Sequence, residues 1–217
     1  MKGKAHQTHS EDIRRKLLEE ILPHVAFDGW TDKALKEAAT RLDIDEAEMK
    51  AAFPRGMADA LLFFSHQADD RAEAIIAEAD LKAMKIRERV AFGVRTRIEV
   101  IGKHREAARR GAAVFALPQH ALDGATAIYR TCDMIWRTIG DTSTDFNFYT
   151  KRGLLAGVYG ATVLYWLNDK SPGSAESWAF LERRIADVMR IPPAMARFGR
   201  LGSLLPNPLR LLRPLRR

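Results

Sequence analysis

Apolar residues recur at intervals of three and four positions along most of the chain, which is the spacing of one face of an α-helix. The pattern is clear in Ile13, Leu17, Ile21 and Val25, and it continues to Val188. Alternation of apolar and polar residues with a period of two, which marks a half-buried strand, does not extend far enough to predict a strand. The sequence therefore predicts an all-α fold.

Helix boundaries follow from capping residues and from breaks at Pro and Gly. Three helices come first, then one long helix, and then five more. A kink is expected near Pro23, because proline removes a backbone hydrogen bond inside a helix. The predicted helices cover residues 11–27, 31–42, 45–53, 57–79, 86–101, 105–116, 122–139, 146–168 and 178–188.

The positive charge of the chain is confined to its C-terminal end. The formal net charge is +7, and residues 190–217 contain seven arginines and neither an acidic residue nor a lysine. These seven charges account for the whole net charge, so the preceding part of the chain is neutral. A neutral body argues against a surface that follows the phosphates of a nucleic acid.

The charge boundary and the helix pattern divide the chain into residues 11–55, 56–191 and 192–217. The last segment combines leucine clusters with arginines, which suits the surface of an anionic bilayer, although its prolines prevent a long regular helix. The alternative is a basic tail that binds any anionic surface, including RNA. The predicted membrane-binding residues are Leu204, Leu205, Arg210, Leu211, Leu212, Arg213 and Leu215.

Cysteine usage and the N-terminal residues favour a cytoplasmic protein. Cys132 is the single cysteine, so no internal disulfide is expected. The first ten residues lack the apolar segment of a signal peptide. The uncharged stretch 153–167 is shorter than the roughly 20 residues that span a bilayer. We therefore expect a bacterial protein, or one already processed, without a transmembrane helix.

The N-terminal helices resemble the helix-turn-helix domain of TetR-family regulators. The resemblance lies in Gly29-Trp30-Thr31, in Ala34 and Ala38, and in the long helix that follows. A DNA-reading third helix needs donors for phosphates and base edges, whereas residues 43–48 carry four acidic side chains before Lys50. We expect a scaffold that does not bind DNA; the alternative is a TetR-like transcriptional regulator with an apolar ligand pocket.

A second, more specific resemblance lies in the C-terminal half. The stretch 140–152 (GDTSTDFNFYTKR), with further matches at 133–136 and 178–184, resembles the Coq-nine family of ubiquinone biosynthesis proteins over roughly residues 13–190. The resemblance implies a TetR-like fold, an enclosed pocket for an isoprenoid quinone or phospholipid, a homodimer and peripheral membrane association. It also implies assistance to the demethoxyubiquinone hydroxylase.

Large aromatic residues around this stretch form a candidate docking patch. The helix cap explains the polar residues of the stretch, but it does not require Trp136, Phe148 and Tyr149. From the residues alone, a core role for Trp136 and Phe148 is equally open. The resemblance implies hydroxylase contact by these three residues with Asp133 and Arg152, and a weaker anchor because Phe148 stands where the family often has Trp.

The predicted helix 146–168 carries a stripe of small residues at Gly153, Gly157 and Gly160. Such a stripe allows a second helix to approach closely, either inside the chain or in a homodimer. The apolar residues opposite it either fill the core or line a lipid cavity, and the resemblance favours the cavity. The candidate lining residues are Phe92, Ile98, Phe115, Leu117, Ile128, Leu155 and Tyr159.

Catalytic and metal-binding patterns are not apparent in the sequence. The six histidines lack metal-ligand spacing, and neither a phosphate loop nor a dinucleotide fingerprint occurs. We therefore expect neither an enzyme nor a metal or cofactor site. The prediction is a lipid-binding accessory protein that presents a quinone intermediate to the hydroxylase at the cytoplasmic face of the bacterial inner membrane.

Overall fold

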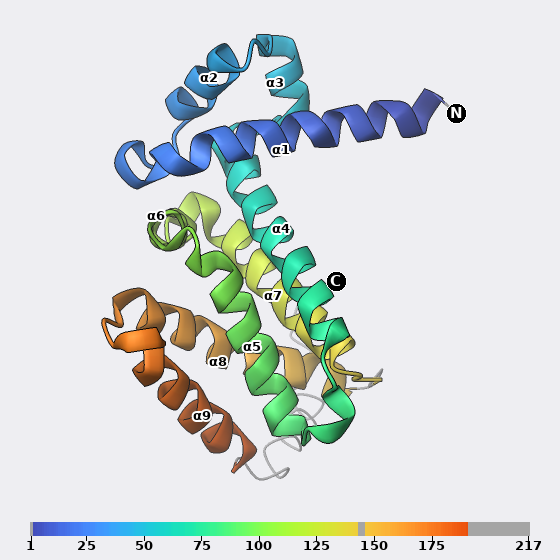
Figure 1. The fold of residues 1–217 in the computed structure, drawn as a ribbon, viewed down its shortest axis with the longest axis vertical. Helices are drawn as coiled ribbons and strands as arrows, with labels where there is room; N and C mark the ends of the chain where they lie inside the picture. The colour runs from blue at the N-terminus through green and yellow to red at the C-terminus, as the bar shows by residue number, and fades with distance from the viewer. Residues whose placement is uncertain (1, 143–145, 191–217) are drawn as a thin grey trace, which may run out of the picture.

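The structure is a computed structural model that describes residues 2–142 and 146–190, with the side chains of residues 9–142 and 148–190. Within these ranges the regular elements are all helical (Figure 1). The α-helices are α1 (Lys2–Asp28), α2 (Asp32–Arg41), α3 (Glu46–Ala52), α4 (Met57–Glu78), α5 (Ile86–Gly102), α6 (Arg105–Phe115), α7 (Ala121–Thr138), α8 (Phe146–Asn168) and α9 (Ala175–Met189). Short 3-10 turns lie at Leu81–Ala83, Pro118–His120 and Pro172–Ser174.

The all-α prediction is confirmed, and most predicted helix boundaries lie within one or two residues of the observed ones. The largest difference is at α1, which begins at Lys2 and continues through Pro23. Its apolar face begins only at Ile13, so the polar turns before that residue carried no hydrophobic signal. Helix α9 begins at Ala175, three residues before the first apolar position used to predict it.

Side-chain caps fix the short N-terminal helices. Thr31 Oγ1 accepts a hydrogen bond from the backbone N–H of Ala34 at 3.2 Å, and Asp45 Oδ1 accepts one from Glu48 at 2.7 Å. Threonine and aspartate are among the residue types preferred at helix N-caps. They satisfy backbone donors that the first turn of a helix leaves free.

The start of α4 is fixed by a residue of α2. Asp32 Oδ1 accepts a hydrogen bond from the backbone N–H of Met57 at 2.8 Å. Gly56 has a φ of +61°, and a Cβ there would lie 2.2 Å from the same oxygen. Glycine is therefore required where the third helix turns into the long one.

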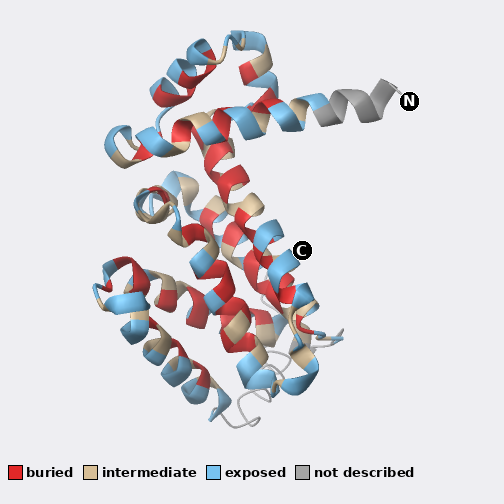
Figure 2. Ribbon diagram, viewed as in Figure 1, coloured by how far each residue is buried: buried red, intermediate tan, exposed pale blue. Residues whose placement is uncertain are grey.

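The core lies along α4, α5 and α7, at the centre of the molecule (Figure 2). Val94, Ile98 and Ile135 are fully buried there. Helices α5 and α7 approach closely at Gly93, where a Cβ would lie 2.8 Å from Ile135 Cγ2. The buried apolar residues form one continuous cluster from Ile13 to Ile185, so the N-terminal helices share their core with the larger part.

Trp30 is the clearest link between the two parts. Its Nε1 donates a buried hydrogen bond to the Ala107 carbonyl of α6 at 2.9 Å. Its ring lies 5.5 Å from that of Phe64 on α4. Figure 1 shows α1 crossing above α6 while α4 runs from the three-helix end into the larger part. The three-helix end is therefore anchored to the body beside the site described next.

Candidate functional site

A cavity of about 450 Å³ lies among α4, α5, α6, α7 and α8, and we call it cavity 1. Its volume falls in the range of small-molecule sites. The lining is apolar apart from Ser65, Arg97, Thr131 and Tyr159. The apolar residues are Leu61, Phe64, Ile101, Ala108, Gly111, Ala112, Phe115, Ala116, Ala121, Gly124, Ala125, Ala127, Ile128, Gly160, Val163 and Leu164.

Exposure along the lining distinguishes a mouth from a closed end. Ala121 and Ala125 at the start of α7 are exposed, and Leu164 on α8 is 60% exposed. Arg97 and Thr131 are only 2% and 1% exposed. Cavity 1 therefore has an apolar mouth and a buried polar end.

The structure brings together three of the seven predicted lining residues, namely Phe115, Ile128 and Tyr159. The structure places the other four predicted lining residues outside cavity 1. Ile98 is fully buried in the core, and Leu155 lines a different cavity. Phe92 and Leu117 line neither cavity 1 nor this second cavity, which is described below, and Leu117 is 45% exposed. Helical periodicity identifies the buried face of a helix but does not reveal where facing side chains leave a gap.

Small residues, which the sequence-based predictions missed, make up much of the lining of cavity 1. The AAxxGAA run of α6 supplies Ala108, Gly111 and Ala112 to the lining. A Cβ at Gly111 would lie 2.7 Å from Leu61 Cδ1, and one at Gly124 would lie 2.8 Å from Phe115 Cβ, so these two glycines allow α6 to approach α4 and α7 closely. The usable signal was a helix face made of alanine and glycine between large apolar residues.

The polar end of cavity 1 is one connected network around a buried ion pair. Arg97 Nε donates to Asp69 Oδ1 at 2.6 Å, and Thr131 Oγ1 donates to the same oxygen at 2.8 Å. Arg97 Nη2 donates to the carbonyl oxygen of Ser65 at 3.0 Å and to its hydroxyl at 3.2 Å. The four residues come from α4, α5 and α7, so the network ties three core helices together at the closed end.

Two further titratable groups border this network. Burial raises the pKa of the Tyr159 hydroxyl, which therefore stays protonated at neutral pH. Burial, helped by the charge of Asp69, raises the pKa of the Cys132 thiol to about 12. A thiol in this state is a small apolar side chain and not a nucleophile.

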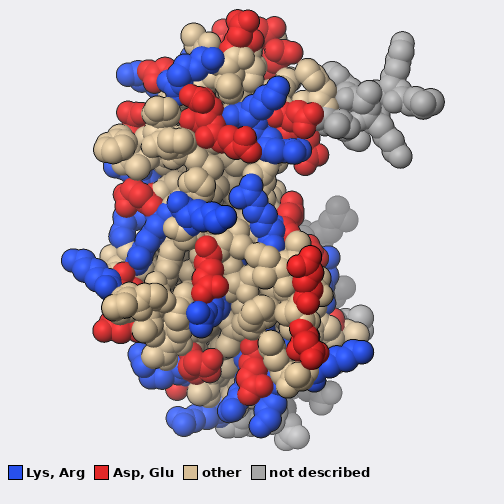
Figure 3. All heavy atoms as spheres, in the orientation of Figure 1, with Lys and Arg blue, Asp and Glu red and all other residues tan. Residues whose placement is uncertain are grey.

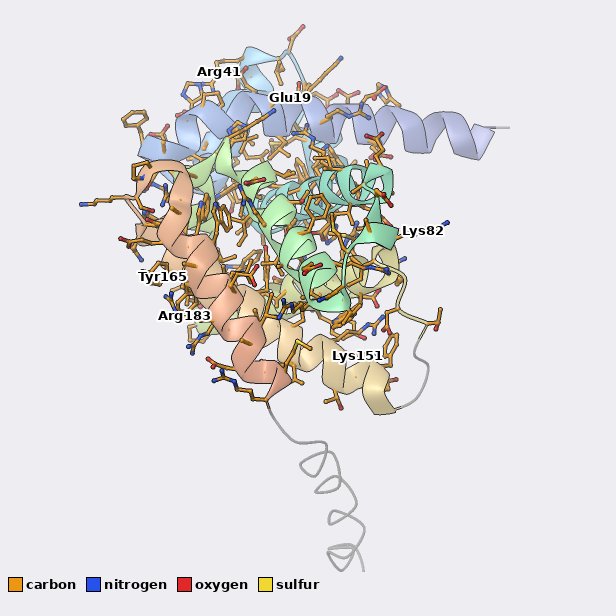
Figure 4. All side chains as sticks on the ribbon, turned by 60° about the horizontal axis from the view of Figure 1, so that its bottom comes forward. Glu19, Arg41, Lys82, Lys151, Tyr165 and Arg183 are labelled. Carbon is orange, nitrogen blue, oxygen red and sulfur yellow. The ribbon has the colours of Figure 1, made fainter. Side chains whose placement is uncertain are left out.

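A second cavity, of about 310 Å³, lies where α5 and α8 begin and α7 and α9 end, and we call it cavity 2. Trp136 and Lys151 line it together with Leu154 and Leu155. Figure 4 shows Lys151 on the initial turns of α8, whereas Tyr165 lies near the other end of that helix, beside α9. Cavity 2 therefore adjoins the predicted docking patch.

Arg152 is the structural centre of that patch. It is 1% exposed, its Nε donates to Asp133 Oδ1 at 2.6 Å, and its Nη1 donates to the Phe148 carbonyl at 3.2 Å. Its guanidinium also lies 3.3 Å from the centroid of the Phe148 ring. A side chain this deeply buried positions the patch from beneath, and direct contact of Arg152 with a partner stays a prediction.

The aromatic residues of the patch divide between packing and exposure. Tyr149 is 67% exposed and meets the Phe148 ring edge-on at 5.1 Å. Phe148 and Trp136 are half-buried, and Trp136 Nε1 donates to the Lys151 carbonyl at 3.2 Å. Tyr149 is thus the aromatic side chain most available to another molecule, while Trp136 and Phe148 combine packing with partial exposure.

The glycine stripe of α8 is open in this chain. An ideal Cβ at Gly153, Gly157 or Gly160 would meet no heavy atom of the described structure within 4 Å. Gly153 and Gly157 are exposed, and Gly160 lines cavity 1. Close internal packing of the stripe, one of the two sequence-based interpretations, is therefore not found among the described residues. The other interpretation, a subunit interface, stays a prediction.

Other predictions concern the tail, membrane spans and metal ions. The predicted membrane-binding residues between Leu204 and Leu215 lie outside the described residues. Among the helices that the structure describes, none has the length and apolar character to cross a membrane. Among the described side chains, no three His, Cys, Asp or Glu residues lie close enough together to hold a metal ion.

Comparison with known protein families and sequences identifies proteins that this chain resembles. Residues 121–192, which cover α7 to α9, match the COQ9 family model. The chain is 30% identical over 188 residues to the rat "Ubiquinone biosynthesis protein COQ9, mitochondrial" and 28% identical to its human counterpart, covering 83% of this chain. It spans about three fifths of the length of these relatives, at 60% and 59%.

The fold has its own counterpart among solved structures. A TetR transcriptional regulator from Nitrosomonas europaea ATCC 19718 superposes with a TM-score of 0.62 at 16% identity, over 81% of this chain and 97% of that one. At this identity the likeness concerns the fold, and it confirms the TetR-like prediction. The chain therefore combines a TetR-like fold with a match to the COQ9 family model at residues 121–192, and over most of its length it is similar in sequence to COQ9 proteins.

Proposed function

We propose that this chain is a lipid-binding accessory protein of ubiquinone biosynthesis. Cavity 1 takes up the apolar part of an isoprenoid quinone intermediate or of a phospholipid, and the protein presents that lipid to the demethoxyubiquinone hydroxylase. The observation that carries the proposal is the apolar, open-mouthed cavity of about 450 Å³. The names of the COQ9 relatives support the pathway. In this proposal the hydroxylase performs the chemistry, and the chain is not an enzyme.

Native mass spectrometry of the purified protein, followed by lipid extraction, tests uptake. Ala112 faces cavity 1, whereas Ala113 is its exposed neighbour on α6. We expect wild type and Ala113→Phe to retain a bound lipid, and Ala112→Phe to lose it because the new ring occupies the cavity. Equal lipid in all three proteins, each with a cooperative melting transition, would contradict uptake by cavity 1.

The hydroxylase contact is proposed for the surface around Tyr149, which is 67% exposed and adjoins the half-buried Trp136 and Phe148. Tyr149→Ala is expected to weaken binding to the purified hydroxylase without changing the melting temperature. Tyr129→Ala is a matched control, because Tyr129 is a 44% exposed tyrosine on α7. Unchanged binding by Tyr149→Ala, or equal loss in both variants, would argue against this surface.

Membrane association is proposed for the leucine- and arginine-rich residues 200–217, and with it a peripheral location at the cytoplasmic face of the bacterial inner membrane. Anionic lipids attract arginines while leucines insert at the interface. Deleting residues 200–217 should abolish flotation with anionic liposomes. Retained flotation would assign membrane binding to another part of the chain. Accumulated quinone intermediates in a deletion strain would test the pathway itself.

A TetR-like transcriptional regulator is the second candidate, favoured by the solved structure with the same fold. Against it, the acidic Asp45, Glu46 and Glu48 lie at the start of α3. Figure 3 shows acidic side chains gathered at that end of the molecule, where a DNA reader needs positive charge. A gel shift at low salt against genomic fragments distinguishes the two, and a site-specific band would favour the regulator.

A further inference from the structure

Cavity 2 is lined by apolar residues and two cationic ones, and no acidic residue is among its described lining residues. Its volume of about 310 Å³ falls within the range of small-molecule sites. The cationic members are Arg87 and Lys151. The apolar lining residues are Ile86, Val90, Trp136, Leu154, Leu155, Val158, Ile185, Val188 and Met189. This composition suits a hydrocarbon chain that is attached to an anionic group.

The opening of cavity 2 is formed by exposed apolar side chains. Ile86, Leu154 and Met189 are 48%, 36% and 58% exposed. Leu155 and Val158, which line the same cavity, are buried. Large apolar side chains that gather at a surface mark a site of contact with another molecule or with a membrane. Cavity 2 thus has an apolar opening that leads to a buried apolar end.

Positive charge at this opening is only partly balanced. Lys151 Nζ lies 2.7 Å from a carboxylate oxygen, but Arg87, which is 58% exposed, reaches only its neighbour Glu88, at 3.9 Å. Arg190 is exposed directly after the end of α9 and forms no ion pair with the described residues. Residues 80–90 carry four basic and two acidic side chains. Figure 3 shows Lys and Arg side chains along the lower edge of the molecule, so the opening faces solvent with a surplus of positive charge.

The C-terminal residues of the chain follow directly from the wall of cavity 2. Helix α9 ends at Met189, which is a lining residue, and residues 190–217 come next. Figure 1 shows this end of α9 at the same edge of the molecule as the start of α5. Only residues 190–199 separate it from the proposed membrane-binding residues 200–217, a span of at most about 35 Å. Membrane binding by residues 200–217 therefore brings the opening of cavity 2 near the lipid surface.

We propose that cavity 2 is a second membrane contact: it takes up one acyl chain of an anionic phospholipid of the membrane, while the phosphate of that lipid pairs with Arg87. This inference rests on the proposed membrane association and adds a lipid site outside cavity 1. Residues 200–217 supply most of the affinity for the membrane, and the site in cavity 2 orients the body of the protein. The surface around Tyr149 then lies beside the membrane, where it meets the hydroxylase.

Quenching of tryptophan fluorescence by phospholipids with brominated acyl chains tests this contact, because bromine quenches only at short range. Trp136 lines cavity 2 and is one of four tryptophans in the chain. The full-length protein would be mixed with vesicles of phosphatidylglycerol and phosphatidylcholine, with or without bromine. We expect brominated vesicles to quench wild type more strongly than Trp136→Phe. The same difference is expected when both proteins also carry Ala112→Phe, which fills cavity 1.

Two further variants alter the site and keep its tryptophan. Val188 is half-buried in the wall, so Val188→Phe places a ring in cavity 2 and should reduce the quenching to the level of Trp136→Phe. Arg87→Glu should weaken binding to phosphatidylglycerol vesicles about 5- to 30-fold, because it reverses one charge at an anionic surface. Arg15→Glu is the matched control: Arg15 is 51% exposed and pairs with Asp12 on α1, at the other end of the molecule. A cooperative melting transition would show that each variant folds.

The outcomes separate this inference from the proposed function. Equal quenching of wild type and Trp136→Phe by vesicles that both proteins bind would overturn the inference, and cavity 2 would then be covered by the C-terminal residues or by the hydroxylase. Equal weakening of binding by Arg87→Glu and Arg15→Glu would also contradict it. If wild type does not bind the vesicles, the proposed membrane association fails and the inference fails with it. Failure of lipid uptake by cavity 1 alone would leave the inference intact.

Discussion

Replacing the open glycines of α8 with alanine should stabilise the isolated chain. Glycine in a helix interior costs about 0.8–1 kcal/mol relative to alanine, because the backbone loses more entropy on folding. A Cβ at Gly153 or Gly157 meets nothing within 4 Å in the described structure, so no clash offsets the gain. The double variant Gly153→Ala/Gly157→Ala should gain about 2 kcal/mol, or roughly 4–8 °C in melting temperature for a chain of this size.

Urea denaturation at low micromolar concentration measures this gain, and analytical ultracentrifugation of the same samples reports self-association. If α8 packs against a second copy through the stripe, the added methyl groups should weaken that dimer while the monomer gains stability. Loss of stability in a demonstrably monomeric sample would refute the reasoning, because it would mean that the stripe packs closely within one chain. Gly173→Ala is an instructive control: its surroundings are also open, but its φ of +61° makes alanine unfavourable.

Three further predictions concern buried groups. Trp30→Phe should lower the free energy of unfolding by about 1–2 kcal/mol, measured by urea denaturation, because the Ala107 carbonyl loses its buried donor. Asp133→Ala should cost about 2 kcal/mol in the same assay, less than a fully buried pair, because Arg152 keeps its contact with a second carboxylate, Asp141. Cys132, whose pKa is raised to about 12 by burial, should resist a thiol reagent at pH 8 in the folded protein and react fully in denaturant.

The helices were predictable because their signals are local. Apolar spacing of 3.6 residues, caps such as Thr31 and Asp45, and breaks at Pro and Gly all act within a few positions along the chain. The exception was the start of α1, where the first turns are polar and precede the apolar face at Ile13. Local signals give the existence and type of an element, but a polar extension leaves no periodic trace.

Cavity 1 was only partly predictable, because a cavity forms where the side chains of neighbouring helices leave space unfilled. Phe115, Ile128 and Tyr159 were identified as apolar and suitably placed, whereas Ile98 has the same character and packs tightly in the core. The alanines and glycines of α6 decide where the gap opens, and their effect depends on which helix faces them. The pairing of Arg97 with Asp69 across 28 positions has no local signature at all.

The docking patch illustrates a similar limit. The family resemblance assigned Arg152 to the docking patch together with the aromatic residues. In the structure it is buried between two carboxylates and the Phe148 ring. Tyr149, one residue beyond Phe148, is the exposed member. Which face of a helix turns inward at its first turn depends on the neighbouring helices, and residue type alone does not decide it.

Photo-crosslinking tests the central claim, uptake of a lipid chain by cavity 1, most directly. A long-chain carboxylate with a diazirine near its hydrocarbon end would be irradiated with the full-length protein, and the labelled peptides would be mapped by mass spectrometry. The account predicts labels on residues that line cavity 1, among them Ala108 and Phe115 on α6 and Ile128 on α7, and their loss in Ala112→Phe. Labels confined to α1–α3 or to the residues of cavity 2, unaffected by Ala112→Phe, would contradict it.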